Sequence, residues 1–204
     1  MKQKITTIPN LLDSAPLHQV AALNKNEHLE SWTYNVIDEF KHLTVAQIKH
    51  KLAETAFPYA VLCENVIGDF NLGTIIRNAN AFNAREIYYI GNKKFDRRGM
   101  CGVHNYSDVK WLSTIDELLA LKDKYVFVGV DNISGAIPVS SHSWEKNTLL
   151  IFGEEGVGLT PTIQKLCDKI VYIEQFGSVR SLNVGTASGI IMHQAVSSYK
   201  TSAE

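Results

Sequence analysis

The sequence predicts an α/β fold in which a mostly parallel sheet is flanked by helices, with an N-terminal helical extension before it. From residue 59 onward, short apolar runs alternate with segments of helical periodicity, which is the order of βαβ units. Several runs are apolar throughout, as is typical of strands that are covered on both faces. The strand candidates are residues 59–63, 86–90, 109–112, 125–130, 149–152 and 170–173.

The first part of the chain is predicted to be a separate helical extension. Thr44 and Gln47 form a T-x-x-Q capping box in front of a stretch with one apolar helical face. Pro58 disfavours helix at the residue before it, so the extension is expected to end there. This divides the chain into an extension, residues 1–58, and a main domain, residues 59–204.

Composition limits the classes of partner. With 204 residues, 45 % of them hydrophobic, the chain can bury a core. The formal charge of −1 gives no global sign of a polyanion partner, so an RNA surface must be a local patch. The three cysteines are widely spaced, and the seven histidines form no H-x-x-x-H or H-E-x-x-H pair, so we expect reduced thiols and no metal site.

The sequence also predicts a cytoplasmic protein with no membrane partner. Residues 1–16 lack an apolar segment of signal-peptide length, and no run approaches the roughly 18 apolar residues of a membrane span.

Between the strand candidates, residues 72–82, 114–122 and 160–167 are helix candidates. The first of these helices carries a group of polar residues. Asn71 is the expected N-cap of that helix, and Arg77 shares a helical face with Gly73. A guanidinium among apolar neighbours is suited to hold a phosphate or carboxylate by two parallel bonds. The alternative is an arginine that ties down a neighbouring carboxylate.

A second constellation is G-E-E-G-V-G-L at 153–159, after the strand candidate at 149–152. Its glycine spacing is not the dinucleotide fingerprint, and no G-K-[ST] follows, so phosphate binding is disfavoured. Glu154 and Glu155 would also repel phosphate. A neutral or cationic ligand fits better, and the alternative is a tight strand-to-helix turn with an acidic pair.

A third constellation joins a loop to the last helix. Arg180, Ser181 and Asn183 precede a run of small residues that begins at Gly185. Asn183 is expected to cap the last helix. Small residues let another backbone or a ligand approach closely, which indicates a binding edge.

One loop is densely basic. Its cations follow the strand candidate at 86–90 and are interleaved with Phe95 and glycines, a pattern suited to RNA phosphates and base stacking. The alternative is a solvated loop. The candidate RNA-binding residues are Lys93, Lys94, Arg97 and Arg98.

Taken together, N-x-G-x-x-x-R-x-A at 71–79, the segment at 153–159 and S-L-N-V at 181–184 resemble the three ordered motifs of the SpoU (TrmH-type) RNA ribose 2'-O-methyltransferases of the SPOUT superfamily. The resemblance covers about residues 59–200. It implies a C-terminal trefoil knot, bound S-adenosylmethionine, and a homodimer whose interface contains the last helix, where the small residues would let a helix of the second subunit approach. The implied reaction methylates a ribose 2'-hydroxyl in tRNA or rRNA.

The resemblance also implies roles for single residues, and these are the expectations for the site. The implied catalytic residues are Asn71, Arg77, Glu155, Ser181 and Asn183. The implied cofactor contacts, made largely through backbone groups, are Gly153, Ile173 and Leu182.

The chain departs from the family pattern at two places. Gly185-Thr186 follows S-L-N-V where the family more often has Ser and Val, and Asn78 stands where threonine is more usual. Both departures concern helix packing. The alternative functions are a non-catalytic RNA-binding protein of the same fold and a nucleotide-dependent oxidoreductase. The missing G-x-G-x-x-G disfavours the oxidoreductase.

Overall fold

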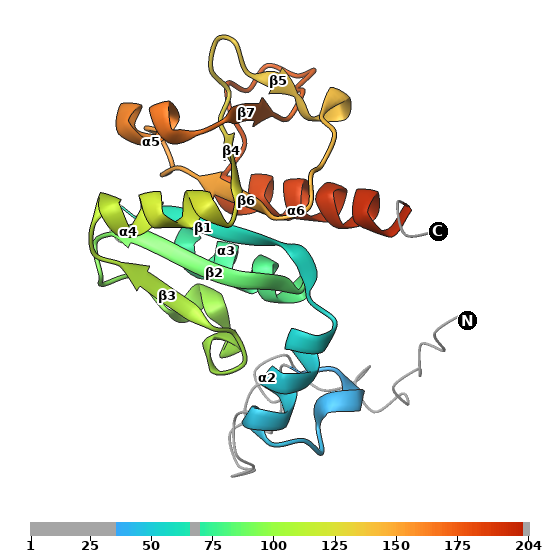
Figure 1. Cartoon of the computed structure of the whole chain (residues 1–204). Coiled ribbons are helices and arrows are strands. Elements are labelled where there is room, and N and C mark those ends of the chain that lie inside the picture. Colours follow the sequence, from blue (N-terminus) through green and yellow to red (C-terminus); the bar gives the residue numbers. More distant parts are fainter. Residues whose placement is uncertain (1–35, 66–69, 202–204) are drawn as a thin grey trace, which may run out of the picture. The chain divides into compact units, whose positions relative to one another are not determined.

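The computed structural model describes residues 36–65 and 70–201 (Figure 1). The chain separates into two units, residues 1–41 and 42–204. In the first, the described part contains a short 3₁₀ turn, η2 (Asp38–Phe40). The second contains all the remaining described elements, including the helix α2 (Val45–Glu54). The domain boundary near residue 58 stays a prediction, and the extension before residue 36 lies outside the described residues.

The sheet is parallel throughout the described part of the chain. Its seven strands follow the order β3-β2-β1-β6-β4-β7-β5, and every neighbouring pair is parallel. The strands are β1 (Phe57–Asn65), β2 (Ala84–Gly91), β3 (Val109–Leu112), β4 (Val126–Val130), β5 (Ile137–Pro138), β6 (Thr148–Phe152) and β7 (Lys169–Tyr172).

All six predicted strands are confirmed, with ends that differ by at most two residues. The structure adds β5 at the edge beside β7. Two residues carry no periodic pattern, so β5 could not be predicted.

The predicted helices are present as well. The capping box at Thr44 and Gln47 is complete, with both reciprocal hydrogen bonds. The predicted helix at 114–122 is a short α-helix that continues as a 3₁₀ turn. The remaining elements are α3 (Asn71–Ala81), α4 (Ile115–Leu119), α5 (Pro161–Leu166), α6 (Val184–Thr201), η3 (Arg98–Met100), η4 (Val103–Asn105), η5 (Ala120–Asp123) and η6 (Val139–Ser141).

Two helices cover each face of the sheet, so the strands are buried on both sides (Figure 1). In β1, Tyr59 and Val61 pack with α3 and α6, whereas Ala60 and Leu62 point to the opposite face, where residues of α4 and α5 pack. This alternation explains why the inner strands β1, β4 and β6 carry continuous apolar runs instead of an apolar residue at every second position.

The small residues of α6 pack against α3 of the same chain. A side chain added at Gly185 would meet Thr74 within 2.9 Å. Asn78 Nδ2 donates to the Gly185 carbonyl and to Ser188 Oγ, both at 2.9 Å. The expectation that these small residues serve a subunit interface is therefore wrong for Gly185 and Ser188. The predicted trefoil knot stays a prediction.

Candidate active site

A pocket opens at the carboxyl ends of β4, β6 and β7. This is the edge at which parallel α/β sheets bind their ligands. Its volume of about 470 Å³ suits a small-molecule ligand. Its wall is formed by residues from four chain segments, namely 130–133, 153–158, 172–175 and 180–187.

The glycine-rich segment forms one wall of this pocket as a closed turn. Glu154 and Gly158 exchange two backbone hydrogen bonds, of 3.1 and 2.9 Å. A Cβ on Gly153 would lie 2.2 Å from the Gly158 carbonyl carbon, so only glycine fits there. Asp131 Oδ2 accepts a hydrogen bond of 2.8 Å from the Leu159 amide and so ties the turn to the end of β4.

The three sequence motifs meet in one hydrogen-bond network. Asn71 Nδ2 donates to Glu155 Oε2 at 2.5 Å. Asn183 Nδ2 lies 3.1 Å from the same oxygen and 3.0 Å from Asn71 Oδ1. Residues far apart in the sequence are thus held together beside the pocket, which Glu155 and Asn183 both line.

Asn183 also caps α6, as predicted. Its Oδ1 accepts a hydrogen bond of 3.1 Å from the Thr186 amide. The amide side chain therefore uses its oxygen for the helix and its nitrogen for the network. The predicted N-cap role of Asn71 is wrong: α3 begins at Asn71 itself, and the cap position is Phe70, which makes no side-chain cap bond. The side chain of Asn71 bonds Glu155 instead of the helix start.

Arg77 lies apart from the other expected catalytic residues. Its side chain is exposed rather than buried among apolar neighbours, and it is not among the residues that line the pocket. Nη1 donates to Cys101 Sγ at 3.2 Å. Cys101 directly follows η3 and has a left-handed backbone, with φ of 46°. Within one chain, Arg77 therefore belongs to the surface of the loop between β2 and β3.

The other expected residues lie at the pocket. Ser181 is an exposed lining residue, and the three expected cofactor contacts Gly153, Ile173 and Leu182 all line the wall. The structure thus brings together seven of the eight expected site residues and leaves Arg77 outside. Their roles in catalysis and cofactor binding stay predictions.

The four cations of the basic loop are exposed. Arg98 forms an ion pair of 2.5 Å with Asp96. Lys93 Nζ lies over the ring of Trp111, 4.7 Å from its centroid. Phe95 packs inward, edge-on against Tyr89 with ring centroids 5.3 Å apart.

Several pocket residues were missed by the sequence interpretation. Asp131 and Asn132 line the wall, and Asn132 Nδ2 donates to the Arg180 carbonyl at 3.3 Å. Gln175 lines it as well. Asp131 and Asn132 directly follow a predicted parallel strand, and the rule that ligands bind at strand carboxyl ends would have found them.

Within residues 36–65 and 70–201, no group of three or more acidic, histidine or cysteine side chains could hold a metal ion. None of the helices in this part of the chain is long and apolar enough to cross a membrane.

The chain is similar to curated RNA methyltransferases. A tRNA (guanosine(18)-2'-O)-methyltransferase of Aquifex aeolicus is 28 % identical over 141 residues, which are 66 % of this chain and 67 % of that protein. The 23S rRNA (guanosine-2'-O-)-methyltransferase RlmB of Shewanella oneidensis is 26 % identical over 162 residues, which are 76 % of this chain and 66 % of that protein.

A solved structure agrees with these matches. The SpoU methyltransferase AviRb from Streptomyces viridochromogenes, crystallised with the cofactor AdoMet, resembles the present fold with a TM-score of 0.61 and 27 % identity. The match covers 68 % of this chain and 56 % of that one. The model of the SpoU rRNA Methylase family matches residues 58–193, more than half of the chain. The chain therefore belongs to the SpoU rRNA methylase family.

Proposed function

We propose that this chain is an RNA methyltransferase that uses S-adenosylmethionine to methylate a ribose 2'-hydroxyl in tRNA or rRNA. The observation that carries the proposal is the Asn71–Glu155–Asn183 network, which joins the three family motifs beside one pocket. The relatives in Aquifex aeolicus and Shewanella oneidensis are named for this reaction on tRNA and on 23S rRNA. These names support either tRNA or rRNA as the substrate.

The pocket fits a cationic adenosine cofactor. Its volume of about 470 Å³ is within the range of small-molecule sites. The carboxylates of Asp131 and Glu155 lie in its wall, where they complement the positive charges of a sulfonium and an ammonium group. The turn at Gly153 and Gly158 presents backbone instead of side chains, as expected for contacts made through main-chain groups.

The chemistry sets the tasks for the side chains. A bond forms between the 2'-oxygen and the methyl carbon, the carbon–sulfur bond breaks with its electron pair moving to sulfur, and the hydroxyl loses its proton. The bound cofactor supplies the activated methyl group. An arginine cannot be deprotonated in proteins. We therefore assign Arg77 to holding the hydroxyl and its neighbouring phosphate in line, with the proton passing late to that phosphate.

The position of Arg77 supports a homodimer. One chain leaves the guanidinium outside its own pocket, so we propose that Arg77 of the partner subunit completes the site. The exposed side of α6 offers a surface for the second copy, because it carries an open, mostly apolar hollow. That hollow is lined by Gly189, Ile190, His193, Gln194 and Ser197. The cytoplasmic location stays a prediction.

The substitution Arg77→Ala tests the proposed reaction. It should abolish methyl transfer while the dissociation constant for S-adenosylmethionine stays nearly unchanged, because Arg77 acts on the RNA and lies outside the pocket of its own chain. Transfer of a tritiated methyl group to unmodified tRNA and rRNA transcripts measures the first quantity. Isothermal titration measures the second.

Two outcomes would contradict the assignment. Substantial turnover by Arg77→Ala would remove Arg77 from the catalytic set. If the wild-type chain binds RNA but gives no titration heat or thermal shift with S-adenosylmethionine, it is a non-catalytic RNA-binding member of the family.

A further inference from the structure

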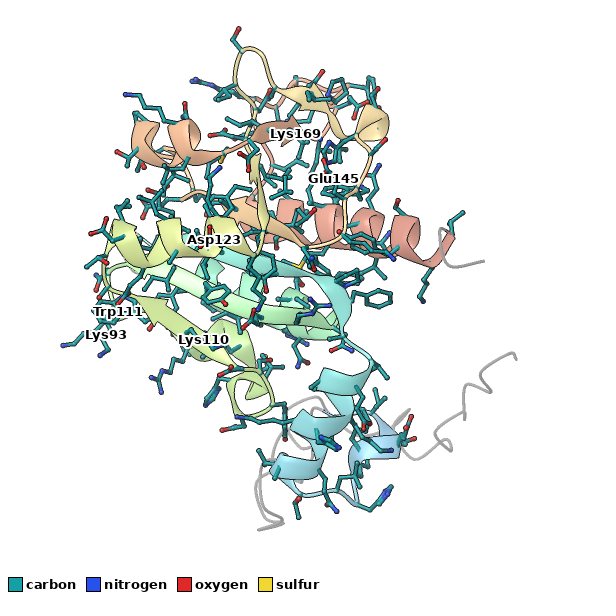
Figure 2. All side chains as sticks on the ribbon, viewed as in Figure 1. Lys93, Lys110, Trp111, Asp123, Glu145 and Lys169 are labelled. Carbon is teal, nitrogen blue, oxygen red and sulfur yellow. The ribbon has the colours of Figure 1, made fainter. Side chains whose placement is uncertain are left out.

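An exposed tryptophan lies at the edge of the sheet. Trp111 belongs to β3, the terminal strand in the sheet order, and 37 % of the residue is exposed. Its indole Nε1 donates to the Gly91 carbonyl at 3.1 Å, which fixes the orientation of the ring. Figure 2 shows Trp111 beside Lys93, next to the end of β3. An exposed aromatic ring with a fixed orientation offers a face on which another flat group can stack.

Unpaired positive charge lies beside this ring. Lys93 Nζ lies 4.7 Å from the ring centroid of Trp111. Arg97, on the same loop, is exposed. Neither cation forms an ion pair with a carboxylate among the described residues, whereas Arg98 is paired with Asp96. Lys93 and Arg97 are therefore available to an external anion.

The loop between β2 and β3 joins this surface to the expected catalytic arginine. In register, Trp111 lies opposite Tyr89 on the neighbouring strand, and Phe95 anchors the loop on the Tyr89 ring. Burial raises the pKa of Tyr89, and the nearby charge of Arg97 opposes this rise. At its other end, the same loop contacts Arg77 through Cys101.

The loop itself is held close to α3. A Cβ on Gly73 would lie 3.1 Å from Gly99 Cα and from the Met100 amide nitrogen, so backbone packs directly on backbone. The position of the loop relative to α3 is thus fixed by main-chain contacts. An RNA strand bound at Arg77 can continue along this loop toward Trp111.

We propose that Trp111 is a stacking platform for an unpaired base of the RNA substrate, with Lys93 and Arg97 binding the adjacent phosphates. The proposal rests on the RNA methyltransferase function proposed above. When RNA binds, the side chain of Lys93 moves from the Trp111 ring to a phosphate, and the base stacks on the face of the ring that the lysine has left. Stacking tolerates any base, so this contact adds affinity and position instead of sequence preference.

Binding to two synthetic RNA probes tests the proposal with the full chain. One probe is a fluorescent oligoadenylate of about twelve nucleotides, within the size range of single-strand sites, and the other is an abasic strand with the same number of phosphates. Trp111→Ala should weaken oligoadenylate binding about tenfold and change abasic binding by less than about twofold, because stacking needs a base. Lys93→Ala should weaken both.

Control variants separate stacking from a general loss of structure. Trp111→Phe retains an aromatic face and should bind oligoadenylate within about threefold of wild type. Leu119→Ala removes a side chain of similar exposure, 40 %, from α4 on the opposite face and should change neither probe. Wild-type affinity in Trp111→Ala, or an equal loss for both probes, would overturn the proposal.

A measurement on the unaltered protein covers the case in which Trp111→Ala does not fold. Irradiation with an RNA strand that carries 5-bromouridine should give an adduct on the peptide that contains Trp111. An adduct confined to other peptides would overturn the proposal.

The outcomes also distinguish this proposal from the proposed function. If base-dependent binding requires Trp111 but no RNA is methylated, the stacking surface stands and the methyltransferase assignment fails. If RNA is methylated and Trp111→Ala leaves its KM unchanged, the stacking surface fails alone.

Discussion

At the scale of single residues, Asn183 has two roles that can be separated. Its oxygen caps α6 through the Thr186 amide, and its nitrogen bonds Asn71 and Glu155. The first role belongs to helix stability and the second to the shape of the candidate site. Replacing Asn183 with a residue that has an acceptor oxygen but no amide nitrogen should therefore change only the second role.

The substitutions Asn183→Ser and Asn183→Ala measure these roles. Serine is as good an N-cap as asparagine, so Asn183→Ser should keep the wild-type free energy of unfolding, whereas Asn183→Ala should lose about 1 kcal/mol. Both should lower methyl transfer similarly, because both remove the donor to Glu155. Urea denaturation and turnover measure the two quantities. If turnover and the free energy of unfolding fall in parallel in the two variants, the two roles of Asn183 are not separate.

At the scale of elements, Glu86 links β2 to β3 and to the residues just before β4. It forms an ion pair of 3.0 Å with Lys110 of β3, and it accepts hydrogen bonds from Lys124 and Tyr125, which precede β4. Burial alone would raise the pKa of this carboxyl group, but the hydrogen bonds prevail and lower it from 4.5 to about 2. The charged form is therefore favoured by folding.

The lowered pKa of Glu86 predicts how the free energy of unfolding changes at acid pH. A lowered pKa contributes stability that is complete above pH 4.5 and is lost as the pH falls from 4.5 towards about 2. Glu86→Gln should therefore be less stable than wild type at neutral pH and should lose less stability on acidification. Denaturation midpoints across this pH range measure the difference. Asp116→Asn, on the exposed face of α4, is the control; equal slopes for wild type and Glu86→Gln would contradict the role of Glu86.

The elements were predictable because burial and caps act locally. Apolar runs indicated six of the strands, and Thr44 and Asn183 indicated helix starts that the structure confirms. Asn71 misled as an N-cap because a distant carboxylate, that of Glu155, takes its side chain. Such a tertiary contact overrides a local preference and leaves no trace in the spacing of nearby residues.

The site was predictable in part from the topology of a parallel sheet. Loops at the ends of parallel strands converge, so the motifs at 153–159 and 181–184 meet as expected. The small residues of α6 were assigned to a subunit interface, but Gly185 and Ser188 pack on Thr74 and Asn78. Composition indicates that something approaches closely, but it does not indicate which segment does.

At the scale of the whole molecule, one chain does not bring all the expected site residues to its own pocket. Six of the eight expected site residues line the pocket and Asn71 bonds two of them, but Arg77 faces the loop at Cys101. If the partner subunit's Arg77 completes the site, two differently defective subunits should restore each other. If Arg77 acts on its own pocket, they should not.

A mixed dimer therefore decides where Arg77 acts. Arg77→Ala leaves the pocket intact, whereas Ser181→Trp should fill it and abolish S-adenosylmethionine binding, because Ser181 lines the wall and is exposed. Each variant alone should be inactive. The mixed dimer, isolated through two different tags, should regain about half of the wild-type turnover, because one of its two sites has both parts.

The proposed dimer surface supplies the control for this experiment. Ile190 lines the hollow on the exposed side of α6 and is 40 % exposed. Ile190→Glu in both subunits should give monomers by light scattering and should remove the restored activity, because a buried unpaired charge opposes association. Ile115→Glu on α4, where the side chain is 38 % exposed, should change neither quantity. A mixed dimer that forms but stays inactive would place Arg77 at the pocket of its own chain, which then requires the β2–β3 loop to move.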